Sequence, residues 1–284
     1  MKDRLNAIIE YMYVEVILGK AVGKGASVLT YFSSSPIEVG SIVEVPLMRG
    51  KAPGVVYKKV AQPDFKCREI LKILYSKPLP EHLLKTAVWM SEYYAAPVSA
   101  VIQMILPVGV MKKRRRTEQR QVQNSAFSTR SRRPVVTGGA SLFLLPLSQD
   151  GLKSTNSELV VPLNHAQKKA LIALQKAPGR TKLLLGVTGS GKTNIYLTEA
   201  ARAVRDQKSV ILLVPEIALT SQLVKVFGET FGRVVTVIHS KQTEAERHLI
   251  FDSLLDSEGP KIVIGPRSAL FAPLNNLGLI IIDE

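Results

Sequence analysis

An eight-residue pattern in the second half of the chain limits the possible fold more than any other feature. The segment GVTGSGKT, residues 186–193, fits the pattern G-x-x-x-x-G-K-[ST] and follows the apolar run TKLLLG, residues 181–186. Glycines allow such a loop to turn its backbone N–H groups toward phosphates, and the helix that follows adds its positive N-terminal end. A chance glycine-rich turn would rarely match every fixed position between a strand and a helix. The pattern therefore predicts a nucleotide-binding P-loop.

Each position of this loop has an expected task. The Lys192 ammonium would reach the β- and γ-phosphates of ATP, and the Thr193 hydroxyl would bind Mg²⁺. The whole loop would contact the nucleotide, through Gly186, Val187, Thr188, Gly189, Ser190, Gly191, Lys192 and Thr193.

Apolar runs and helical stretches alternate from residue 181 onward. The runs lack the polar alternation of a half-exposed strand, so they indicate a parallel sheet covered on both faces. The expected strands are TKLLLG, SVILLV, VVTVIH, KIVIG and LGLIIID, with helices over 192–205, 219–230 and 243–255.

The last run, LGLIIIDE, ends in two carboxylates. In P-loop NTPases an apolar strand that ends in Asp supplies the second magnesium anchor, which is Asp283 here. Glu284 stands where such enzymes keep the carboxylate that orients the attacking water. Lys192, Asp283 and Glu284 are therefore the expected catalytic residues. The alternative is a buried strand that ends at a solvated turn.

The N-terminal part of the chain follows another pattern. Short β-branched runs separated by glycines over residues 11–60 predict a small twisted sheet or partly closed barrel. Apolar residues at helical spacing over 80–106 predict two helices, the second starting at Pro97. Trp89, Tyr93 and Tyr94 could stack on bases, but an aromatic stripe at helical spacing is more often part of the core. We expect these rings to be buried.

Charge gives the clearest sign of a partner. The net charge is +15, and residues 112–133 carry nine Lys/Arg against the single acid Glu118. This stretch indicates a flexible linker, and Arg114, Arg115 and Arg116 would follow a nucleic-acid backbone. The alternative is a solvated tether without a binding role.

Other classes are disfavoured by composition. Cys67 is the single cysteine, so neither an internal disulfide nor a cysteine-built zinc site is expected. The sequence has no apolar run of about 18 residues and no signal peptide, which indicates a cytoplasmic protein without a membrane span.

Several segments together resemble the PriA family of replication-restart helicases. GVTGSGKTNIYL, LLVPEIALTSQL, IVIGPRSALFAPLNNLGLIIIDE and LNHAQKKAL are similar to the first helicase lobe of that family, and VEVPL, SEYYAAPVSAV and LPVGV are similar to its N-terminal module. The resemblance implies an α/β chain with a small α+β DNA-binding module, of the kind that binds a 3′ end, before an incomplete RecA-like P-loop parallel sheet. The implied domains are the module over 1–110, a basic linker in place of a winged-helix domain over 111–160, and a truncated first lobe over 161–284.

The resemblance also implies roles for single residues. Gln167 would contact the adenine. Residues that hold or couple to single-stranded DNA would be Pro215, Glu216, Thr220, Arg267 and Ser268. The family's Phe-Asp-Tyr reads Leu29-Thr30-Tyr31 here, so recognition of a terminal 3′-hydroxyl is expected to be weak.

The implied activity is ATP-driven 3′-to-5′ DNA unwinding in replication restart and primosome assembly, with ATP and Mg²⁺ as cofactors. Forked or single-stranded DNA would be the partner, with primosome and single-strand-binding proteins beside it. This chain is expected to bind DNA and ATP without processive unwinding. Two alternatives stay open: a non-enzymatic fork-binding remnant, and another superfamily-two translocase such as a RecG-like one.

A further expectation concerns the sheet. In the family another strand lies between the P-loop strand and the strand that ends in Asp-Glu. Residues 183–185 and 279–282 are therefore expected to lack a partner on one side.

Overall fold

The computed structural model describes residues 11–22, 26–111, 162–187, 189–215 and 222–283. Contacts divide the chain into two compact units. Unit 1 is formed by Met1–Lys112, Lys241–Glu258 and Leu270–Asn275, and unit 2 by Lys113–Ser240, Gly259–Ala269 and Asn276–Glu284. Unit 1 therefore takes two short segments from the last part of the sequence.

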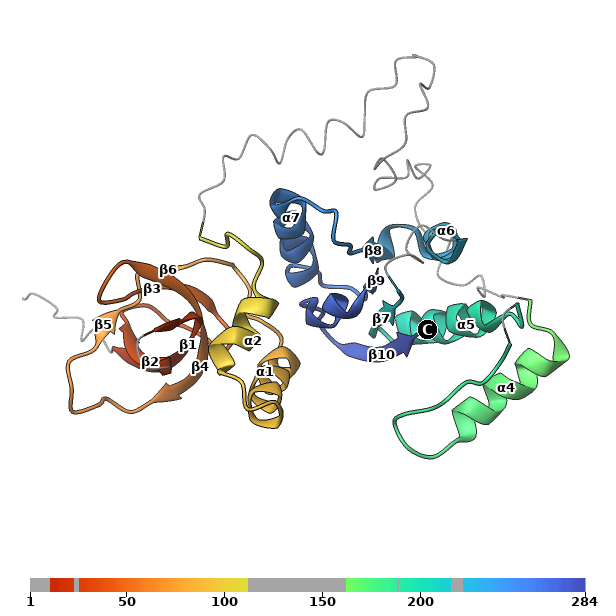
Figure 1. The fold of residues 1–284 in the computed structure, drawn as a ribbon, viewed down its shortest axis with the longest axis horizontal. Helices are drawn as coiled ribbons and strands as arrows, with labels where there is room; N and C mark the ends of the chain where they lie inside the picture. The colour runs from red at the N-terminus through yellow and green to blue at the C-terminus, as the bar shows by residue number, and fades with distance from the viewer. Residues whose placement is uncertain (1–10, 23–25, 112–161, 188, 216–221, 284) are drawn as a thin grey trace, which may run out of the picture. The chain divides into compact units, whose positions relative to one another are not determined.

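Unit 1 is built on a six-stranded sheet with the order β5-β2-β1-β4-β3-β6. Its strands are β1 (Met12–Val22), β2 (Ala26–Ser33), β3 (Ile42–Pro46), β4 (Lys51–Val60), β5 (Arg68–Glu69) and β6 (Lys72–Ile73). The outermost strands, β5 and β6, are only two residues apart in sequence, so residues 68–73 join both edges. Ile70 N donates to Phe32 O at 2.9 Å and Leu71 N donates to Glu44 O at 2.9 Å. The sheet is thus closed into a small barrel, visible as curled strands in Figure 1, and the predicted barrel is confirmed.

Side chains of alternating strand positions fill this barrel. On β1, Val14, Val16 and Leu18 belong to a buried cluster with Tyr31 and Val43, whereas Ile17 belongs to a second cluster with the helices. Successive side chains of a strand point to opposite faces, so one strand serves both cores.

Two helices supply the second core of unit 1. They are α1 (Glu81–Tyr93) and α2 (Val98–Ile105), and α2 begins after Pro97 as predicted. Their buried residues lie at helical spacing: Leu83, Leu84, Ala87, Val101, Ile102 and Ile105.

The aromatic residues at the end of α1 are exposed, so the prediction that they are buried is wrong. Trp89, Tyr93 and Tyr94 are between 54% and 68% exposed. With about 100° per residue, Trp89 and Tyr93 lie on the side of α1 opposite Ala87. Their rings contact each other instead, with centroids 5.0 Å apart.

The helix α7 (Glu244–Leu255) also belongs to unit 1, and Phe251 and Leu255 join the core of α1 and α2. The buried His248 ring lies between Tyr75 and Val108. Its Nε2 is 2.7 Å from Val108 O, and its Nδ1 is 3.0 Å from the Tyr75 hydroxyl. Because a carbonyl can only accept, Nε2 donates to Val108 O.

Unit 2 holds a four-stranded parallel sheet with the order β10-β7-β9-β8. Its strands are β7 (Ser209–Leu213), β8 (Val235–Val237), β9 (Ile262–Gly265) and β10 (Leu277–Ile282), and its helices are α4 (His165–Lys176), α5 (Lys192–Arg205) and α6 (Gln222–Phe231). Every residue of β7 is buried, as expected for a strand covered on both faces. The predicted parallel sheet is confirmed for these four strands.

The strand expected over residues 181–186 is not formed. Residues 181–187 lie in no helix or strand, and Leu183 and Leu185 are 80% and 82% exposed. Within the described ranges, β10 is one of the two outer strands of the sheet, and no strand pairs with its other side. A strand needs a neighbour to bond its backbone groups, which explains why this apolar run is not ordered as one. The expected lack of a partner on one side is confirmed for β10, whereas residues 183–185 form no strand at all.

Candidate functional site

The predicted P-loop leads directly into α5. Gly189 and Gly191 have φ values of 80° and 79°, a left-handed conformation that glycine adopts without steric cost. A Cβ atom on Gly191 would also collide with the amide nitrogen of Gln167. Glycine is therefore required at the end of this loop, and α5 begins at the next residue, Lys192.

Lys192 folds back over the loop from the first turn of α5. Its Nζ donates to Gly186 O at 2.7 Å and to Val187 O at 3.2 Å. The ammonium therefore lies beside the backbone that the pattern assigns to the phosphates. The helix N-terminus adds a second source of positive potential at the same place.

Gln167 connects α4 to the loop. The Gln167 N–H donates to Asn164 Oδ1 at 2.9 Å and Gln167 Oε1 accepts from Asn164 N at 2.9 Å, which is a capping box. Its Nε2 donates to Ser190 O at 3.2 Å and to Gly191 O at 3.3 Å. The buried Gln167 side chain thus holds the loop against the start of α4, and its contact with adenine stays a prediction. The spacing Asn164-x-x-Gln167 is the sequence signal for this cap, and the sequence analysis did not use it.

Asp283 follows β10 at the carboxyl edge of the sheet. Its N–H donates to Leu213 O at 2.9 Å, which extends the pairing of β10 with β7 by one residue. Its Oδ1 accepts a hydrogen bond from the Tyr196 hydroxyl at 3.0 Å. Burial, followed by the bond to the Asp283 carboxylate, raises the pKa of Tyr196 to about 12. The tyrosine therefore stays a donor at neutral pH.

A cleft of about 360 Å³ opens where β7, β9 and β10 end. In a parallel sheet this edge is where ligands gather. The cleft is lined by Asp283 and by three of the residues that were predicted to hold or couple to single-stranded DNA: Pro215, Arg267 and Ser268. The remaining lining residues are Leu213, Val214, Pro266 and Ile282.

The residues present fit a magnesium ion. No group of three or more His, Cys, Asp or Glu side chains that could hold a metal occurs in the described ranges. Mg²⁺ does not need such a cage, since it keeps waters and binds through one or two carboxylates and the phosphates of a nucleotide. Thr193 lies three residues before Tyr196 on α5, which puts it on the helix face that meets Asp283. Thr193 and Asp283 would therefore hold the ion, which would neutralise charge on the phosphates.

Some predicted residues fall outside the described ranges. These are Thr188, Glu216, Thr220, Glu284 and the three linker arginines Arg114, Arg115 and Arg116.

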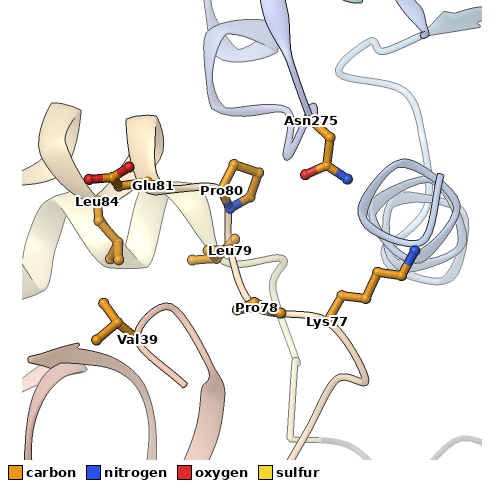
Figure 2. Close-up of a pocket in the computed structure, with 8 residues that line it drawn as sticks. All are labelled: Val39, Lys77, Pro78, Leu79, Pro80, Glu81, Leu84 and Asn275. Atoms are coloured by element: carbon orange, nitrogen blue, oxygen red, sulfur yellow. The ribbon is translucent and has the colours of Figure 1, made fainter. Parts of the chain in front are cut away.

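A larger cleft, of about 590 Å³, lies in unit 1 (Figure 2). Its lining does not resemble a nucleotide or magnesium site. Its polar side chains already have partners within unit 1. Lys77 Nζ donates to Asp256 O, Glu81 pairs with Lys85, and Asn275 Nδ2 donates to Ser257 O. The rest of its lining is apolar: Val39, Pro78, Leu79, Pro80 and Leu84. Figure 2 shows these side chains around the start of α1.

Two family models match the chain in succession. Residues 14–107 match a 3′DNA-binding domain (3′BD), and residues 164–284 match the DEAD/DEAH box helicase model. The loop and the parallel sheet lie within the matched residues, so this part of the chain is similar to a DEAD/DEAH box helicase domain.

The curated relatives are replication restart proteins. PriA of Chlamydia pneumoniae is 32% identical over 331 residues, which cover 96% of this chain and 43% of the relative. PriA of Helicobacter pylori strain J99 is 33% identical over 256 residues, covering 90% and 35%. PriA of Rickettsia conorii is 30% identical over 250 residues, covering 87% and 33%. The chain belongs to the PriA family and spans less than half the length of these relatives.

No helix in the described ranges is both long enough and apolar enough to cross a membrane.

Proposed function

We propose that this chain supplies the ATP-binding lobe and the DNA 3′-end module of an ATP-dependent 3′-to-5′ DNA helicase that acts in replication restart. The observation that carries the proposal is the arrangement around α5. Lys192 at its first residue lies over the loop, and Tyr196 in its second turn contacts Asp283 across the sheet edge. Magnesium–ATP binding requires a P-loop lysine and a strand-end carboxylate near each other, and here both lie beside the same helix, α5.

Magnesium-dependent ATP binding is the first test. The chain should bind a fluorescent ATP analogue in Mg²⁺, and Lys192→Ala should abolish that binding because it removes the ammonium that the P-loop provides for the phosphates. Lys225→Ala is a matched control, since Lys225 is an exposed lysine on α6 of the same unit, paired loosely with Glu229 at 3.9 Å. Equal binding by wild type and Lys192→Ala would contradict the proposal.

Hydrolysis by the chain should be slow. The matched residues correspond to a first helicase lobe, and related NTPases gain ~10³–10⁵ in rate from an arginine supplied by another domain or protein. We therefore expect almost no phosphate release by the isolated chain. Turnover of several ATP per second would show that the chain supplies its own catalytic cation.

DNA binding is the second test, and the basic segment should contribute to it. Each neutralised phosphate adds ~0.9 to the slope of log K against log salt, so replacing Arg114, Arg115 and Arg116 with Ala should lower the slope by about 2–3. The control removes three positive charges near the end of α5, at Arg202 and Arg205 of the helix and at Lys208 before β7, and it should leave the slope unchanged. An unchanged slope in the linker variant would make this segment a tether.

The match to a 3′DNA-binding domain also suggests a substrate test. Forks with and without a 3′-hydroxyl at the junction should bind almost equally, because Leu29 cannot stack a base and Thr30 is a weaker acceptor than a carboxylate. Strong preference for the hydroxyl would show that other groups of unit 1 read it. Fork binding without any ATP binding would favour the alternative of a non-enzymatic fork-binding protein.

A further inference from the structure

Tyr196 contacts a predicted site residue, Asp283, although the sequence patterns did not point to it. It lies on α5 three residues after Thr193 and four after Lys192, so the three side chains share one face of the helix. The signal available in the sequence was this spacing, in which a residue with a hydroxyl follows the P-loop by one helical turn.

The Tyr196 ring is fixed by packing. It lies against the buried cluster of unit 2, which includes Leu197 and Ala200 of α5 and Ile281 of β10. A side chain whose orientation is set by apolar contacts can hold a polar partner without further ordering cost. The Tyr196 hydroxyl therefore reaches Asp283 from a fixed base.

Asp283 is held at two points. Its backbone N–H is bonded to Leu213 O at 2.9 Å, and its Oδ1 accepts from Tyr196 Oη at 3.0 Å. The carboxylate can rotate about its side-chain bonds unless a partner fixes it, and Tyr196 is such a partner. One phenol donates one hydrogen bond, which goes to Oδ1, so Oδ2 stays available to a cation.

We propose that Tyr196 is a positioning residue for the magnesium–nucleotide site, whose hydroxyl fixes Oδ1 of Asp283 so that Oδ2 is directed to the ion. This inference rests on the proposed function, because it requires that Asp283 binds Mg²⁺. Groups that orient a metal ligand in this way affect metal affinity by ~10–100-fold when they are removed.

Tyr196→Phe tests this role, because it removes the hydroxyl and keeps the ring. The experiment titrates Mg²⁺ into the full chain with a fluorescent ATP analogue, and it repeats the binding measurement in EDTA. The Mg²⁺ concentration at half-saturation should rise ~10–100-fold in Tyr196→Phe. Binding of the analogue in EDTA and the unfolding midpoint should stay as in the wild type.

Two further variants complete the experiment. Thr198→Val removes another hydroxyl from α5, one that donates to Asn194 O at 2.8 Å, and it should leave the Mg²⁺ titration unchanged. Asp283→Asn should abolish the response to Mg²⁺.

Each contrary result has a distinct meaning. A wild-type titration curve in Tyr196→Phe overturns the inference and leaves the proposed function intact. Loss of binding in EDTA, or a lower unfolding midpoint, shows that the hydroxyl has a general structural role and also overturns it. A wild type whose ATP binding does not respond to Mg²⁺ overturns the inference and the proposed function together.

Discussion

The sheets of the two units differ in the length, charge and exposure of their outer strands. In unit 1 the outer strands β5 and β6 are two residues each, carry Arg68, Glu69 and Lys72, and are joined by the chain itself, so the barrel has no long open edge. In unit 2 the outer strand β10 has the apolar sequence LGLIII, with Ile280 and Ile282 exposed. Natural sheets protect their edges with short or charged strands or by closure, because an open apolar edge recruits other chains.

Apolar runs that were predicted as strands therefore have different outcomes in the two units. The closed barrel satisfies its backbone groups within unit 1. In unit 2 the run TKLLLG contains three consecutive leucines, but it lies outside the sheet in the described residues. Strand formation therefore depends on a neighbour as much as on the run itself.

Hydrogen exchange should show the largest contrast. Residues of β1 and β7 are paired on both sides and should exchange only on global unfolding, which costs ~5–15 kcal/mol in a typical domain. Residues 182–187 should exchange with almost no protection. Peptide-level mass spectrometry measures both. Protection of 182–187 equal to that of β7 would show that this run is paired in solution.

Two leucine substitutions sharpen the contrast within unit 2. Leu212→Ala empties a fully buried position on β7 and should lower the free energy of unfolding by about 2–5 kcal/mol. Leu185→Ala changes an exposed side chain and should shift it by less than ~0.5 kcal/mol. Denaturant unfolding measures both values. A similar loss in both variants would mean that Leu185 is buried in solution.

The tightness of the barrel can be tested at Gly54. A Cβ atom there would lie 2.5 Å from Val16 Cγ1 and 3.0 Å from Ile17 O. Gly54→Ala should therefore destabilise unit 1 by ~1–3 kcal/mol. Gly259→Ala is the control, because its Cβ would meet nothing within 4 Å. No loss in Gly54→Ala would show that β1 and β4 can move apart easily.

The smallest effect is a pH dependence in unit 1. Burial lowers the pKa of His82, and its Nε2 is buried without a hydrogen-bond partner in the described residues. The unfolded chain takes up a proton near pH 6.5 and the folded chain only below that, so the free energy of unfolding falls as the pH drops below about 6.5. Because the side chain is only half-buried, we expect less than ~1 kcal/mol. His82→Phe should remove this fall in denaturant titrations at pH 5 and pH 8, and an unchanged fall would assign it to other groups.

Local patterns were sufficient to predict much of the fold. The helix expected over 192–205 is α5 at the same residues, and the glycine-separated runs of 11–60 form the barrel strands. Both depend on spacing within a few neighbouring residues, which sequence records directly.

Features that depend on distant partners could not be predicted. The exposure of Trp89 depends on which face of α1 meets the sheet. Whether residues 181–186 form a strand depends on the presence of a neighbouring strand. The hydrogen bond between Tyr196 and Asp283 joins residues far apart in sequence. Neither residue type by itself predicts such a bond. The P-loop was recognised because its chemistry is confined to eight consecutive residues.

The position of α7 has a consequence for how this chain can change during evolution. Its Phe251 and Leu255 lie in the core cluster against which Tyr75 packs. Its His248 ring is hydrogen-bonded to the Tyr75 hydroxyl and to Val108 O of the N-terminal module. A recombination event within residues 112–161 would give a hybrid whose Tyr75 and His248 come from different parents. Such hybrids should fold well only when both parents carry matching residues at these positions. Substitutions in α7 are therefore expected to be inherited together with those of the module, although more than 100 residues separate the two in the sequence.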